Sequence, residues 1–135
     1  MTTTSSADNI NILLEDLEKT QRSFLSLLEE IPFDDWDRQP ENTIWTLKHE
    51  MVHIVQVLEV IPKGIWRARA GKKGSLLGLV PAGLRGWVNG RILIPRRARL
   101  ETRDSIRLAY QDAHCALLSL VAELTQADLK KGMPY

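Results

Sequence analysis

Apolar residues recur at intervals of three and four along three segments of this chain, and this spacing is the feature that most restricts its fold. The first segment covers about residues 7–31, the second about 44–61 and the third about 103–124. Such spacing places the apolar side chains on one face of an α-helix. No segment alternates apolar and polar residues for long enough to require a β-sheet. The sequence therefore predicts an all-α protein built on three long helices.

Capping residues and prolines indicate where the predicted helices begin and end. Thr43 or Thr46 can accept the free amide hydrogen bonds at the start of the second helix, and Thr102 can do so for the third. Pro62 predicts a kink or a stop in the second helix. A chain of 135 residues fits one domain, so we predict a single helical bundle domain over residues 1–135.

The predicted second helix is apolar on nearly all of its surface. Beside its main apolar seam it carries Val52, Val55, Val57 and Val60. A helix of this kind is buried on nearly every side, and two partner helices would cover only part of it. Because a large apolar face rarely stays in water, we expect a homo-oligomer, such as a dimer, that covers this face.

Opposite charges are segregated along the chain although their total is close to zero. Residues 1–62 carry 4 basic and 12 acidic side chains, residues 63–103 carry 11 and 1, and the whole chain has a formal net charge of +1. This balance excludes a generically basic nucleic-acid binder and a disordered acidic tail. We expect the glycine- and arginine-rich insertion at about residues 71–101 to be a loop with one or two short turns, in which residues 91–94 could be briefly extended.

The basic segment 63–103 has two alternative interpretations. Its arginines, interleaved with Trp66 and Trp87, suit phosphate groups or peripheral contact with an anionic membrane surface. No nucleic-acid-binding pattern frames the segment, so we expect no specific nucleic-acid partner. The other interpretation is a solvated loop that the acidic half of the chain partly neutralises.

The chain has three histidines, His49, His53 and His114, and they are its candidate metal ligands. His49 and His53 are four residues apart on one face of the second helix, and with Glu50 between them they match the HExxH pattern of zinc peptidases. Two imidazoles in this spacing can bind one zinc ion while the glutamate activates its water. No third ligand follows at a distance typical of these enzymes, and no strand is predicted along which a peptide could lie. The alternative is that His53 is a buried core residue, His49 a surface residue and His114 a structural or exposed one.

A second set of residues points to a family and covers more of the chain. Four features of this sequence resemble the second-helix signature of the DinB-like (YfiT-like) family of bacterial four-helix bundles: Trp36, Pro40, the run Trp45-Thr46-Leu47-Lys48, and His53 eight residues after Trp45. The long first helix and the Leu-Thr-x-x-Asp-Leu turn at residues 124–129, where Thr125 and Asp128 form a capping pair, agree with this resemblance. The resemblance spans roughly residues 8–132.

The resemblance implies a divalent metal, often zinc or nickel, that three histidines hold in the bundle core. His53 matches the ligand of the family's second helix, and the other two ligands come from an H-x-x-x-H pair on the fourth helix. Neither of these two fourth-helix histidines is present in this sequence. The resemblance therefore implies three long helices of a DinB-like four-helix bundle, with the fourth helix absent from this chain and the metal site incomplete. Three outcomes are open: the chain is a truncated fragment, a partner chain supplies the missing helix, or His49 and His114 join His53 in a substitute site.

The function implied by the resemblance is that of a metal-dependent hydrolase or thiol transferase, because the family includes both, and its small-molecule substrate is not identified by the sequence. The alternatives are a non-catalytic helical oligomerisation scaffold, an HExxH zinc metallopeptidase and an anionic-surface binder.

Cysteine usage and the start of the chain bear on its location. One cysteine, Cys115, excludes an intrachain disulfide, and the polar start has no secretory signal pattern, so we expect a cytoplasmic protein. We expect Cys115 to be a buried, unreactive thiol. Trp36 and Trp45 are expected to serve packing rather than ligand binding.

Overall fold

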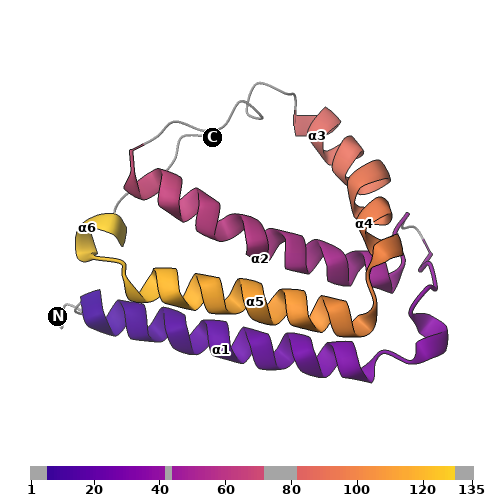
Figure 1. The fold of residues 1–135 in the computed structure, drawn as a ribbon, viewed down its shortest axis with the longest axis horizontal. Helices are drawn as coiled ribbons and strands as arrows, with labels where there is room; N and C mark the ends of the chain where they lie inside the picture. Colours follow the sequence, from indigo (N-terminus) through magenta and orange to yellow (C-terminus); the bar gives the residue numbers. More distant parts are fainter. Residues whose placement is uncertain (1–5, 42–43, 72–81, 130–135) are drawn as a thin grey trace.

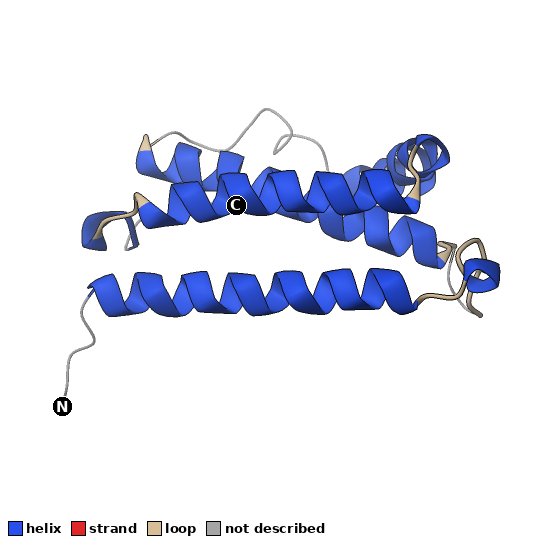
Figure 2. Ribbon diagram, turned by 60° about the horizontal axis from the view of Figure 1, so that its bottom comes forward, coloured by secondary structure: helices blue, strands red, loops and turns tan. Residues whose placement is uncertain are grey.

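A computed structural model of the protein describes residues 6–41, 44–71 and 82–129. In these ranges the secondary structure is entirely helical, with no strand (Figure 2). The three predicted long helices are confirmed as α1 (Ser6–Glu30), α2 (Leu47–Arg69) and α5 (Arg103–Ala122). A 3-10 turn, η1 (Phe33–Asp35), follows α1, and the short α6 (Gln126–Leu129) follows α5. No described helix is long and apolar enough to cross a membrane.

The central helix is α5, which contacts α1 on one side and α2 on the other (Figure 1). Its apolar stripe supplies Ile106 and Tyr110, which are 1% and 2% exposed. The Tyr110 ring stacks on Phe24 of α1 with 4.1 Å between the ring centroids. From the other side α2 buries Val52 and Val55 in the same core. One continuous core therefore joins all three helices.

The predicted caps explain where two of these helices begin. The Thr46 hydroxyl accepts a hydrogen bond from the His49 backbone N–H, and the Thr102 hydroxyl accepts one from Ser105 in the same way. Thr46, rather than Thr43, is thus the cap of α2. The predicted Thr125–Asp128 capping pair is also confirmed, since each residue donates its backbone N–H to the other's side chain.

Pro62 does not stop α2, which continues through it to Arg69. A proline inside a helix removes one hydrogen bond and clashes with the preceding turn. The helix continues because packing of the residues on both sides of Pro62 favours it, with Leu58 buried before it and Ile65 packed against the core after it. The prediction of a stop was wrong because tertiary packing outweighs the local cost.

The predicted loop at residues 71–101 is wrong over residues 82–100, which are helical and include the stretch 91–94 expected to be extended; residues 72–81 lie outside the described part of the chain. Residues 82–100 form α3 (Ala82–Val88), a π-helical turn η3 (Asn89–Leu93) and α4 (Ile94–Leu100), which we call the basic arm. Gly90, Ile94 and Ala98 are buried at its inner side, and α4 contacts α2. This burial outweighs the low helix propensity of the glycines and of Pro95, whose missing N–H leaves a carbonyl of the preceding turn open to another donor. With the arm counted as one helix, the described part of this all-α fold has four substantial helices.

Candidate metal-binding site at His53

His53 lies in the second turn of α2, half-buried beside the ring of Trp45. The two ring centroids are 5.0 Å apart and the ring planes are tilted by 49°. The Nδ1 atom of His53 is buried, and no group in the described part of the chain forms a hydrogen bond with it. Buried polar atoms are nearly always paired, so this nitrogen is the most unusual polar atom of the core.

Trp45 is held in place by the basic arm. Its Nε1–H donates a hydrogen bond of 2.7 Å to the backbone oxygen of Gly90. This oxygen is open to a side-chain donor because the two nearest helical donors do not use it: Ile94 N–H bonds to Asn89 O in the π turn, and Pro95 has no N–H. A Cβ at position 90 would lie 3.5 Å from the indole ring, which is ordinary contact, so the backbone is close to Trp45 but not crowded.

Two further polar contacts join the basic arm to α2. Gln56 Nε2 donates to Asn89 Oδ1 over 2.9 Å. One turn further, Arg97 donates to Glu59 over 2.5 Å and also pairs with Glu101. These contacts raise the pKa of Arg97, against the opposing effect of burial, which is the largest single influence on it. The arm is therefore fixed to the same face of α2 that carries His53.

His49 serves the helix start rather than a metal. Its Nδ1 accepts the backbone N–H of Thr46 over 3.2 Å, which completes the capping box. Burial, with a smaller effect of Lys48, lowers the pKa of His49, so the ring is neutral near pH 7. A neutral imidazole whose Nδ1 accepts a hydrogen bond carries its proton on Nε2. Neither nitrogen then offers a free lone pair to a metal ion in this arrangement.

His114 lies on α5, and its side chain is buried, with only 3% exposed. Its ring stacks over Tyr110, whose centroid is 6.2 Å away. Burial lowers the pKa of His114, and the carboxylate of Glu18 on α1 opposes this shift. Tyr110 stacks on Phe24 of α1, and Glu18 of α1 acts on His114, so His114 lies on the α1 side of α5.

The described residues do not fit a complete metal centre. Catalytic zinc takes three protein ligands and a water. No group of three His, Cys, Asp or Glu side chains among the described residues could hold a metal ion. Cys115, which was expected to be a buried thiol, is exposed. Among the described residues the three histidines therefore do not form a metal site, and His53 Nδ1 is a buried side-chain nitrogen without a hydrogen-bond partner there.

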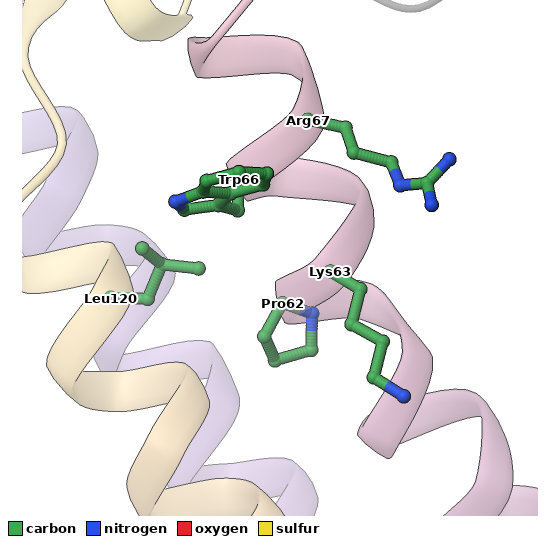
Figure 3. A pocket seen from close by; sticks show the side chains of 5 residues that line it. All are labelled: Pro62, Lys63, Trp66, Arg67 and Leu120. Atoms are coloured by element: carbon green, nitrogen blue, oxygen red, sulfur yellow. The ribbon is translucent and has the colours of Figure 1, made fainter. Parts of the chain in front are cut away.

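A separate pocket of about 470 Å³ lies between α2 and α5 near the end of α2 (Figure 3). Trp66 and Leu120 point toward one another across it, whereas Lys63 and Arg67 point to the outer side of α2. Pro62 completes the lining. At 1.5 Å per residue, Pro62 is about 14 Å from His53 along the helix axis, so this pocket is not part of the His53 site.

Sequence reasoning missed the contacts that position the His53 site. Trp45 was expected to be a packing residue, and it is also a hydrogen-bond donor to Gly90. Gln56 and Asn89 carried no sequence signal that would bring them together, because 33 residues separate them. The sequence offered one hint: Pro95 comes five residues after Gly90 and has no N–H that could donate to the Gly90 carbonyl.

Comparison with known proteins gives one match. The family model described as the DinB superfamily matches residues 16–135. No curated protein and no solved structure matches the chain. The match includes α2 with His53, α5 and the basic arm.

Proposed function

Because this chain belongs to the DinB superfamily, we propose that it is a metal-binding helical protein in which His53 is the one ligand provided by the described helices. The observation that carries this proposal is the buried, unpaired Nδ1 of His53. A buried nitrogen without a partner costs about 1–3 kcal/mol. A metal ion or a donor from outside these helices would remove that cost.

The proposal restricts the role of each histidine. His49 is used by the capping box and His114 is buried on the α1 side of α5, so neither supports a shared site with His53. One imidazole does not hold a metal ion tightly. The residues outside the described ranges include no His, Cys, Asp or Glu, so the remaining ligands must come from solvent or from another copy of the chain in the purified protein. No reaction step is assigned to the site.

Metal binding by variants of the purified protein tests this role. The protein is incubated with zinc or nickel, and the bound metal is measured by mass spectrometry after gel filtration. We expect His53→Ala to reduce the bound metal below about one tenth of an equivalent, because ligand loss weakens binding strongly. His49→Ala is the matched control on the same helix and should retain the metal. Equal loss in both variants, or no binding by the unmodified protein, contradicts the proposal.

A second candidate function is a non-catalytic scaffold that associates with itself through α2. The specific observation is a row of exposed apolar side chains on the uncovered side of this helix. We call this row the α2 stripe: Ile54, Val57, Val60 and Ile61, which are 39–55% exposed. Contiguous apolar surface of this kind commonly marks an interaction site.

The oligomeric state distinguishes this candidate from the first. Sedimentation equilibrium of the unmodified protein should show a dimer, and Val57→Asp should shift it to the monomer. Leu108→Asp on α5 is the control, since Leu108 is 60% exposed and lies outside the stripe. A monomeric protein at high concentration, or dissociation by both variants, would exclude the α2 stripe as the interface.

A further inference from the structure

The basic arm, residues 82–100, concentrates positive charge that the rest of the protein does not neutralise. It contains five arginines and no acidic residue. Arg97 pairs with Glu59 and Glu101. The other four arginines are exposed and form no ion pair within the described part of the chain: Arg85, Arg91, Arg96 and Arg99. The arm therefore presents a cationic surface.

The same surface is also rich in large apolar side chains. Leu84, Trp87, Ile92 and Leu93 are 45–57% exposed, and Leu100 at the end of the arm is 83% exposed. The residues that dock the arm on α2 are different ones, since Gly90, Ile94 and Ala98 are buried. Docking therefore leaves the apolar and the cationic side chains outward. The α3 end of the arm extends away from the layer of α1, α5 and α2 (Figure 1).

We propose that the basic arm binds the surface of membranes that contain anionic lipids. A bilayer interface is anionic at the head groups and apolar a few ångströms deeper, and helices that carry both arginine and Trp, Leu or Ile bind in this boundary. Arginine extends its charged end toward the head groups while its stem lies along apolar surface, so arginines and apolar residues can alternate along one helix. Indole rings prefer the same boundary.

The exposed aliphatic side chains favour lipid over nucleic acid as the partner. A nucleic acid would be held by the arginines and by stacking on Trp87, but it offers little apolar surface to Leu84, Ile92 and Leu93. The arm joins both kinds of side chain within 19 residues, as its bounds show. An anionic bilayer uses both.

Vesicle binding by charge variants tests the proposal. Binding is measured with vesicles of phosphatidylcholine alone and of phosphatidylcholine mixed with phosphatidylserine, at low salt and at high salt. We expect binding to the anionic vesicles only, and weaker binding at high salt. In Arg91→Gln/Arg96→Gln the affinity should fall about 30-fold, since each basic residue near an anionic surface contributes about five-fold. The matched control is Lys19→Gln/Arg22→Gln, two exposed basic residues of α1, which should leave the affinity unchanged.

Tryptophan fluorescence tests the apolar half of the argument. Insertion of Trp87 at the boundary should shift the emission to shorter wavelength on vesicle addition, and Trp87→Phe should abolish the shift. Trp66→Phe is the control, because Trp66 is 54% exposed and lies outside the arm. Absence of binding to anionic vesicles at low salt overturns the proposal, as does equal loss in the Lys19/Arg22 control. Binding to a DNA duplex with no binding to vesicles also overturns it and identifies the arm as a nucleic-acid surface.

Discussion

Replacing Trp45 with phenylalanine tests how the basic arm is held against α2. The substitution keeps an aromatic ring but removes the Nε1–H that donates to Gly90 O over 2.7 Å. Gly90 is buried, and neither Ile94 nor Pro95 donates to its carbonyl. The carbonyl is thus left without its donor, which costs about 1–3 kcal/mol.

The loss of indole volume must be separated from the loss of the hydrogen bond. Trp36→Phe is the matched control, because Trp36 is 7% exposed and loses the same atoms, while its ring keeps Arg103 above it at 4.8 Å. We expect Trp45→Phe to lower the free energy of unfolding by about 1–2 kcal/mol more than Trp36→Phe does. For a domain of this size the melting temperature should then be lower by a further 3–8 °C or so.

Thermal unfolding and hydrogen exchange measure this prediction together. Differential scanning calorimetry gives the melting temperatures of the two variants. Amide exchange should become faster within residues 82–100 in Trp45→Phe and stay unchanged there in Trp36→Phe. Equal melting temperatures for the two variants, with unchanged exchange in the arm, would refute the role of this hydrogen bond.

Three further predictions concern the core, the helix start and pH. Leu28→Ala should lower the free energy of unfolding by about 2–5 kcal/mol in urea titrations, because Leu28 is fully buried and its loss leaves a cavity. A decrease of less than about 1 kcal/mol would mean that the core collapses around the shorter side chain. Thr46→Ala should cost about 1 kcal/mol by the same assay, because it removes the hydroxyl that accepts the His49 N–H. Burial lowers the pKa of His114, so the unfolded chain binds the proton more tightly, and the free energy of unfolding should decrease as the pH falls below about 6.5. In His114→Gln this decrease should be smaller; an unchanged pH dependence would show that His114 does not contribute to it.

The three long helices could be predicted from the sequence because each buries a stripe of its own. The apolar residues of α5 recur at intervals of three and four. Of these, Ile106, Tyr110 and Leu117 are all buried, as the spacing predicts. The capping residues are equally local, since Thr46 and Thr102 bond to groups three residues away. Local spacing is enough when the partners lie within one turn.

The basic arm could not be predicted in this way. Its glycines and Pro95 are typical of a loop, and its helical form depends on Ile94 and Ala98 packing against α2, together with bonds from Trp45 and Gln56 that cross more than 30 residues of chain. The roles of the histidines could not be predicted from the local sequence either. His49 and His53 match a zinc-binding pattern in the sequence, but the capping box at the start of α2 uses the Nδ1 atom of His49.

By itself, the sequence determined an all-α fold, the positions of its three long helices and the family resemblance that the match across residues 16–135 confirms. Periodicity and capping are properties of neighbouring residues, so they can be read along the chain. The tertiary structure decided that residues 82–100 form a helical arm, that His49 serves the capping box while His114 is buried on α5, and that His53 has a buried Nδ1 with no hydrogen-bond partner in the described part of the chain. The arm and the burial of His53 and His114 depend on contacts between helices, which no local pattern specifies, because the free energy of burying a group is set by what the rest of the chain brings against it.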